Sequence, residues 1–273
     1  MTTDITTDIT TGMTTDSKNL VSRDDSEGVT TLTLERADAY NALSDELIDA
    51  LTRSFETLAK DLTSKVVVLR GAGRGFCAGH DLKQLTQDND PSRQQQTFTR
   101  CSNLMQTINQ LPQPVIAEVH GIATAAGCQL VASCDLAVAE EGARFATPGV
   151  NIGLFCSTPM VALSRTVSQK HAMEMLLLGE MISAQRAYEI GLVNRVVTAE
   201  QLKQTTLGLA RNIASKSGNC VRTGKQAFYR QLHQPLAAAY SDCTEVMGCN
   251  IQHPDAIEGI NAFLGKRSPV WSS

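Results

Sequence analysis

The chain has 273 residues, of which 42% are hydrophobic and 19% charged, and its formal net charge is −4. A chain of this length can hold one large α/β domain, or one domain with a small appendage. The acidic balance argues against a nucleic-acid partner, because phosphate binding requires a basic surface. The sequence has no run of apolar residues long enough to cross a bilayer, so we expect no membrane partner.

The eight cysteines are scattered along the chain, with no CxxC pair and no cluster of histidines beside them. We therefore expect no metal site. Several of them, such as Cys128 and Cys134, lie inside apolar stretches. This pattern is typical of buried free thiols in a reducing compartment.

The N-terminal segment, MTTDITTDITTGMTTDSK, is rich in Thr and Asp and has few large apolar residues. Such a composition cannot build a core, and we expect residues 1–20 to be disordered. The segment lacks the charged start and apolar centre of a secretory signal, and it is acidic where a mitochondrial transit peptide would be rich in Arg. These features predict a cytoplasmic protein.

The folded part is expected to begin near Val21. Alternating apolar and polar residues over 29–36 (VTTLTLER) predict its first strand. Ser44 is a suitable N-cap, and the acidic residues that follow it suit the positive end of a helix dipole. Apolar residues at helical spacing then predict an amphipathic helix over 45–61.

Further along, short apolar runs alternate with a helical pattern. They predict strands at 65–71, 114–121 and 135–141, and a helix at 98–110. Strands separated by helices indicate parallel βαβ units. After about residue 158 the pattern is helical to the end, where Pro254 is placed to begin and Gly265 to end a last helix. The predicted fold class is α/β, an α/β core followed by a mostly helical tail.

Two glycine-containing turns follow predicted strands and lead into helical segments, GAGRGFCAGHDLKQL over 71–85 and HGIATAAGCQLVASCD over 120–135. Small residues let the backbone approach a ligand closely, and the free N–H groups at a helix start bind developing negative charge. If the two turns converged, they would form an oxyanion hole suited to a thioester carbonyl. Packing of the turns against their helices is the alternative that the spacing leaves open.

Several motifs together resemble one family. GRGFCAGHDLKQL, IAEVHGIATAAGCQLVASCDLAVA, FATPGVNIGL, ISAQRAYEIGLVNRVV and GINAFLGKRSPVW are similar, in the same order, to signatures of the enoyl-CoA hydratase/isomerase (crotonase) superfamily. The chain looks closest to its "enoyl-CoA hydratase domain-containing" members. The resemblance implies a spiral core of ββα turns over 21–205 and a C-terminal helical trimerisation region over 206–273. It also implies a homotrimer, or a hexamer formed by two trimers.

The resemblance carries catalytic roles onto matching positions. The backbone N–H groups of His80, in CAGHD, and of Ala126, in AAGC, would form the oxyanion hole. The family's two catalytic glutamates are absent, because Gln129 and Gly149 stand at their positions. Glutamine can hydrogen-bond but cannot transfer a proton at neutral pH, and glycine offers no side chain. We therefore expect ordinary hydration to be crippled.

The resemblance also implies an acyl-CoA thioester as substrate, with coenzyme A as part of it and no prosthetic group. Backbone near Cys77 and Ala78 would meet the adenine end, and Lys83 would lie near the phosphates. Phe263 and Lys266 match a tail segment that completes the CoA pocket, in some relatives that of a neighbouring subunit. For both lysines, a solvated surface position is the alternative.

Three functions remain open at this point. One is an acyl-CoA enzyme with different proton chemistry, such as a decarboxylase, whose loss of CO₂ itself creates the enolate. A second is weak hydration or isomerisation through a substitute group. The candidates for this group are the imidazole of His80, Glu118, and the side chains of Cys156, Ser157 and Thr158. The third is an acyl-CoA-binding subunit with no catalytic activity.

Overall fold

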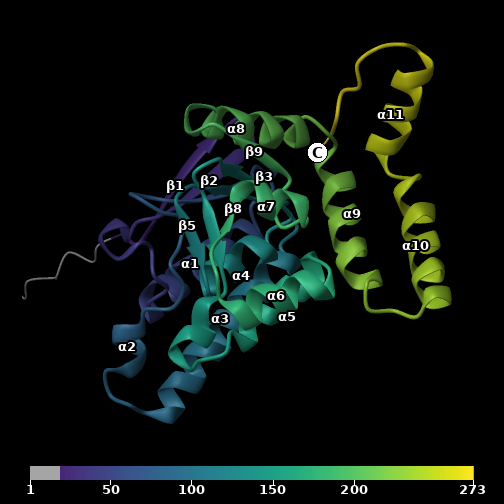
Figure 1. The fold of residues 1–273 in the computed structure, drawn as a ribbon. Helices are drawn as coiled ribbons and strands as arrows, with labels where there is room; N and C mark the ends of the chain where they lie inside the picture. Colours follow the sequence, from purple (N-terminus) through teal and green to yellow (C-terminus); the bar gives the residue numbers. More distant parts are fainter. Residues whose placement is uncertain (1–18, 273) are drawn as a thin grey trace, which may run out of the picture.

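The computed structural model describes residues 19–272, so the disorder predicted for the start of the chain lies almost entirely outside the described residues. Within the described part, no helix is both long and apolar enough to cross a membrane. The architecture is mixed α/β, as predicted, with a sheet between helices and a helical C-terminal region (Figure 1).

The main sheet has six strands in the order β1-β2-β3-β4-β6-β9. Their bounds are β1 Val21–Ser26, β2 Val29–Leu34, β3 Val66–Gly71, β4 Val115–Val119, β6 Leu136–Glu140 and β9 Arg195–Val197. All neighbouring pairs are parallel except β1 with β2. The four predicted strands, one from its alternating pattern and three from apolar runs, are therefore confirmed, and so is their parallel arrangement. A smaller sheet joins β5 (Ile122–Thr124), β7 (Arg144–Ala146) and β8 (Ile182–Ser183) in that order.

Both faces of the main sheet are buried at β3, β4 and β6, which explains why these strands are mostly apolar. In β3, Val67 and Leu69 pack into the large core, while Val66 and Val68 pack with Leu202 of α8 (Ala199–Ala214) on the opposite face. Successive side chains of a strand point to opposite faces, so a strand covered on both sides is apolar throughout. The large core lies under helices α1 (Asp45–Leu58), α3 (Pro91–Gln110) and α4 (Ala126–Ser133).

Side-chain caps fix the starts of two helices that the sequence predicts, α1 and α3. The Ser44 side chain accepts a hydrogen bond from the Leu47 N–H, which confirms the N-cap of α1. Helix α3 begins at Pro91, seven residues before the predicted start, because Asp90 caps it through the Ser92 N–H. Its first turns are polar and exposed, so apolar periodicity gives no sign of them.

The segment after residue 158 is not entirely helical, and that expectation is wrong at two places. Strand β8 pairs with β7, and β9 pairs with β6 at the edge of the main sheet. Both strands are very short, and their few residues give no periodic signal. The remaining helices are α2 Leu82–Thr86, α5 Ser157–Thr166, α6 Gln169–Leu178, α7 Ala184–Glu189, α9 Gly218–Gln231, α10 Leu236–Asn250 and α11 Pro254–Leu264, with short 3₁₀ turns at Ala37–Ala39 and Pro148–Ile152.

Helix α11 begins at Pro254 and is capped at Gly265, as predicted. The boundary expected between the spiral core (21–205) and the C-terminal helical region (206–273) falls inside helix α8, which is continuous there. Helices α9 to α11 lie at one end of the molecule, with α10 and α11 projecting beyond α9 (Figure 1).

A buried lysine of helix α9 forms hydrogen bonds with the core. The Lys225 ammonium lies 2.7 Å from an Asp135 carboxylate oxygen, and it donates to the carbonyls of Ile108 and Gln113, each at 2.9 Å. Burial lowers the pKa of Lys225, while the adjacent carboxylate opposes this shift. A buried charge is tolerated when its partners are in place, as here.

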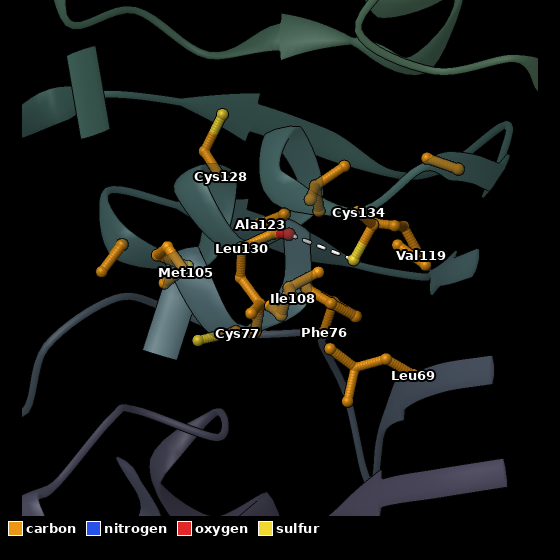
Figure 2. Packing of buried hydrophobic residues seen from close by; sticks show 14 of the residues in the cluster. Leu69, Phe76, Cys77, Met105, Ile108, Val119, Ala123, Cys128, Leu130 and Cys134 are labelled. Carbon is orange, nitrogen blue, oxygen red and sulfur yellow. Dashed lines mark hydrogen bonds between the residues drawn. The ribbon is translucent and has the colours of Figure 1, made fainter. Parts of the chain in front are cut away.

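Five cysteines are buried as free thiols, which agrees with the sequence pattern. Figure 2 shows Cys77, Cys128 and Cys134 among aliphatic side chains such as Leu69 and Leu130. The Cys134 Sγ donates to the Leu130 carbonyl at 3.2 Å. Burial raises the pKa of the Cys77 thiol to about 12. The thiol therefore stays protonated and contributes to core packing, and it does not act as a nucleophile.

Candidate functional site

The two glycine-containing turns lie side by side. Residue 77 pairs with residue 123 in a parallel bridge. The Cys77 N–H donates to the Ile122 carbonyl at 3.0 Å, and the Thr124 N–H donates back to the Cys77 carbonyl at 3.0 Å. The convergence expected from the sequence is therefore present.

At the start of α4, Gly79 of the first turn lies against Ala125 of the second. A Cβ atom added to Gly79 would lie 2.8 Å from the Ala125 Cβ and 3.3 Å from the Ala126 nitrogen. Gly79 has a φ of +98°, which glycine adopts at little cost. Ala125 has φ 49° and ψ −118°, a strained conformation for a residue with a Cβ. Strain of this kind persists only where the surrounding structure imposes it.

This arrangement leaves two backbone N–H groups free. Ala126 is the first residue of α4, whose opening N–H groups have no carbonyl within the helix to accept them. Across the described residues, no backbone carbonyl accepts from the N–H of Ala126 or of His80. The α4 dipole adds partial positive charge at Ala126. A negatively charged or strongly polar oxygen would be stabilised at this point.

The loop that carries His80 is fixed from both sides. The Leu43 N–H donates to the Gly79 carbonyl at 2.7 Å, and the Asp81 N–H donates to the Leu43 carbonyl at 3.2 Å. Asp81 also caps α2 and forms an ion pair of 2.8 Å with Arg36. The His80 backbone is therefore held in place before any ligand arrives, which is what a preorganised donor requires.

A cavity of about 440 Å³ opens beside these N–H groups. This volume lies within the range of about 300–1,000 Å³ that is usual for ligand pockets. Its lining has no Asp, Glu, Lys or Arg side chain and consists of Ala78, His80, Leu82, Leu85, Phe98, Ala125, Ala126, Pro148, Gly149, Asn151, Ile152, Leu154, Phe155, Cys156, Ser157, Thr158 and Pro159. The walls are mostly apolar, with a few neutral polar groups.

The imidazole of His80 packs edge-to-face on the Phe98 ring, with the ring centroids 5.3 Å apart. Its Nε2 is buried and has no hydrogen-bond partner among the described residues. Burial lowers the pKa of His80 to about 4, although the Asp45 carboxylate nearby favours the charged form. The imidazole is therefore neutral at physiological pH and is a weak base.

The resemblance places the family's two glutamates at positions 129 and 149, and only position 149 lines the cavity. Gln129, on α4, is 4% exposed, and its Oε1 has no partner in the described chain. It is absent from the cavity lining. Gly149 lines the cavity, and a Cβ there would lie only 2.0 Å from the Leu154 carbonyl oxygen and 2.9 Å from the Cys156 Sγ. The backbone of the following loop thus occupies the space that a side chain at 149 needs.

The candidate CoA-binding residues are dispersed. Ala78 lines the cavity, and Lys83 is exposed on α2, next to the cavity residue Leu82. The Cys77 side chain is fully buried, so only its backbone could meet a ligand. Phe263, 82% exposed, and Lys266 belong to the tail, which lies at the opposite end of the chain from α2 (Figure 1). Within one chain these two residues do not reach the cavity.

Among the possible substitute groups, Cys156, Ser157 and Thr158 line the cavity, whereas Glu118 does not. Glu118 faces Arg70 at 4.0 Å on the side of the sheet covered by α8, and burial raises its pKa. Phe98 is one of the wall residues that the sequence did not single out. It lies on the predicted helix, but its direction toward His80 depends on tertiary packing.

A model of the enoyl-CoA hydratase/isomerase family matches residues 24–273. The chain belongs to this family. Its members act on acyl-CoA thioesters, and the resemblance seen in the motifs is confirmed. Solved structures agree: that of an enoyl-CoA hydratase from Mycobacterium smegmatis is 50% identical, with a TM-score of 0.91, covering 93% of this chain and 99% of that one. The crotonase fold is therefore also confirmed.

Among curated relatives, the enoyl-CoA hydratase domain-containing protein 3 of Danio rerio is 45% identical over 94% of this chain and 89% of its own. The human protein of the same name is 47% identical over 90% of this chain and 81% of its own. Both names describe mitochondrial proteins. They contradict the cytoplasmic location expected from the acidic N-terminal segment. A segment of low complexity is a weak guide to location, since its composition reflects disorder as much as targeting.

Proposed function

We propose that the protein binds an acyl-CoA thioester in this cavity and stabilises its enolate with the N–H groups of His80 and Ala126. The observation that carries the proposal is the contact between Gly79 and Ala125, which brings two unpaired N–H groups to the cavity wall. Removing one donor of such a pair typically costs about 2.7–4 kcal/mol of transition-state stabilisation. Coenzyme A is then part of the substrate, and the reaction requires no prosthetic group.

The proton chemistry must differ from that of a relative with two glutamates. No carboxylate lines the cavity, and His80 is held neutral. A general acid or base typically contributes 10²- to 10⁴-fold to a rate. The proposal is therefore an acyl-CoA enzyme that relies on stabilising the enolate, with slow proton transfer.

Decarboxylation is the second candidate, favoured by the absence of a carboxylate base from the lining. Cleavage of the bond to the carboxylate leaves its electron pair on the α-carbon, and the enolate forms without a base. Against this candidate, no cationic side chain lines the cavity. Moving an unpaired carboxylate out of water carries a large free-energy cost, so a malonyl-type thioester would bind weakly. A binding subunit without turnover is the remaining possibility.

We further infer a homotrimer, or a hexamer of two trimers, in mitochondria. Helices α10 and α11 expose large apolar side chains, including Leu236, Tyr240, Met247 and Phe263. Apolar patches of this kind mark interaction sites, and a second copy would bring Phe263 and Lys266 toward another chain's CoA. The mitochondrial location follows the names of the curated relatives.

Binding of acetoacetyl-CoA tests the enolate proposal without depending on turnover. This thioester forms an enolate with a distinct ultraviolet absorbance, and an oxyanion hole should increase that absorbance on binding. Turnover of crotonyl-CoA, followed by loss of the enoyl-thioester absorbance, is measured in parallel. Binding with an enhanced enolate band supports the proposal, whether or not crotonyl-CoA reacts. Binding without the band would leave only the binding subunit.

A further inference from the structure

Few side chains of the cavity can move a proton. Among the described residues of the lining, Ser157 and Thr158 contribute hydroxyl groups and Asn151 an amide, and none of these groups ionises near neutral pH. The imidazole of His80 is neutral, because burial lowers its pKa to about 4. The thiol of Cys156 is the remaining ionisable group in this lining.

Cys156 differs from the other cysteines in its position. Of the eight cysteines, all of which the structure describes, only Cys156 lines the cavity. Its side chain is 7% exposed, and it forms the N-cap of α5, shortly after the 3₁₀ turn Pro148–Ile152. Cys220 and Cys249, by contrast, are exposed on α9 and α10. Cys156 therefore combines burial with access to the cavity.

The sulfur of Cys156 lies next to Gly149. A Cβ atom at residue 149 would be only 2.9 Å from the Cys156 Sγ, so a side chain there would cover the thiol. Gly149 itself lines the cavity. Burial raises the pKa of Cys156, while a hydrogen bond with the Gly149 backbone opposes this shift. The thiol is therefore protonated at neutral pH, and it can donate a proton.

The segment after β7 links the thiol to the free N–H groups. The Ala125 N–H donates to the Ala146 carbonyl at 2.9 Å, so this segment starts beside the turn that carries the Ala126 N–H. Three residues after Ala146, Gly149 contacts Cys156. An enolate whose oxygen accepts from the two free N–H groups has its α-carbon one bond from the carbonyl carbon. This carbon therefore lies in the cavity that Cys156 lines.

We propose that Cys156 is a catalytic residue whose thiol gives its proton to the α-carbon of the thioester enolate. The electron pair of the enolate double bond forms the new C–H bond, and the enolate oxygen becomes the thioester carbonyl. The resulting thiolate takes a proton from water. In the reverse direction the thiolate removes an α-hydrogen. This inference rests on the proposed function, since it takes the enolate from it.

The first test follows the exchange of the α-hydrogens of butyryl-CoA for deuterium in D₂O by mass spectrometry. Cys156→Ser keeps nearly the same shape but replaces the thiol with a hydroxyl that does not ionise near neutral pH. A general acid or base typically contributes about 10²- to 10⁴-fold to a rate, so we expect this variant to exchange at least about 10²-fold more slowly. The enhanced absorbance of the bound acetoacetyl-CoA enolate should persist, because both N–H groups remain.

Cys128→Ser is the matched control. Cys128 is buried on α4 close to Cys156, but it does not line the cavity. The same change of thiol to hydroxyl at this position should leave the exchange rate at the wild-type value.

The second test uses the wild-type protein and bromoacetyl-CoA, whose electrophilic carbon corresponds to the α-carbon. The Cys156 sulfur displaces bromide, its proton passes to solvent, and a thioether forms. Peptide mass spectrometry should find this label on Cys156, and an excess of butyryl-CoA should suppress it. Labelling of the exposed Cys220 and Cys249 should not respond to butyryl-CoA.

The outcomes separate this inference from the proposed function. Absence of exchange in the wild type, equal exchange in wild type and Cys156→Ser, or absence of suppressible labelling at Cys156 would overturn the inference. The proposed function stands in each case if the wild type still shows the enolate band, whereas loss of that band would overturn both. If Cys156→Ser loses the band because it folds poorly, the labelling of the wild type decides.

Discussion

Gly79→Ala should separate the two free N–H groups and thereby weaken enolate stabilisation. The new Cβ would lie 2.8 Å from the Ala125 Cβ and 3.0 Å from the Thr124 carbonyl oxygen, so the turns must move apart. Loss of one donor is worth about 2.7–4 kcal/mol. We therefore expect the ratio of bound enolate to bound keto form of acetoacetyl-CoA to fall by about 10²-fold. Ala126→Pro would remove an N–H directly, but the ψ of −118° at Ala125 lies outside the range that precedes a proline.

The control for this variant is Gly191→Ala. Gly191 has a φ of +84°, close to that of Gly79, but a Cβ there would meet nothing within 4 Å. Both variants carry the cost of about 1–2 kcal/mol for a left-handed residue with a Cβ. Only Gly79→Ala adds the displacement at the cavity. If both variants lowered the enolate absorbance equally, or if neither did, the assignment of the two N–H groups would be refuted.

Two further predictions concern the side chains of the cavity. Burial lowers the pKa of His80 from 6.5 to about 4. Between these pH values the imidazole is therefore protonated in the unfolded chain and neutral in the folded chain. The free energy of unfolding should therefore fall by up to about 3 kcal/mol as the pH drops from 6.5 to 4. Urea unfolding of wild type and His80→Gln across this range checks it, and a difference between the two that does not change with pH would contradict it. Gly149→Glu should not restore hydration, because its Cβ would lie 2.0 Å from the Leu154 carbonyl oxygen. We expect overpacking to lower the free energy of unfolding of this variant by about 1–3 kcal/mol. A variant as stable as the wild type that hydrates crotonyl-CoA would disprove both expectations.

Strands β3, β4 and β6 were predictable because burial on both faces favours short runs of mostly apolar residues, and β2 because its apolar residues recur in an alternating pattern. The edge strands were not. Strand β1 reads VSRDDS and is largely exposed, so its pairing with β2 rather than its composition makes it a strand. Strand β9 is three residues long and depends on register with β6. Predicted elements therefore fail where a neighbour, rather than the segment itself, supplies the stabilisation.

The site divides in the same way. The glycine turns around Gly79 and Ala126 were visible in the sequence because close backbone approach restricts the residue type. Phe98 was not visible as a site residue, since its contact with the His80 ring depends on how the helix of Phe98 packs against the loop of His80. Gly149 illustrates a different gap. From the sequence it is a missing carboxylate, whereas the structure gives it a packing role against Leu154.

Lys225 has a consequence for the order in which the chain can be completed. The carbonyls of Ile108 and Gln113 and the carboxylate of Asp135 belong to the core, yet the ammonium that pairs with them comes from α9. A nascent chain emerges from its N-terminus, so these groups are made long before their partner. The Ile108 and Gln113 carbonyls and the Asp135 carboxylate therefore lack the ammonium until α9 has been synthesised, and this part of the core is completed by the C-terminal region.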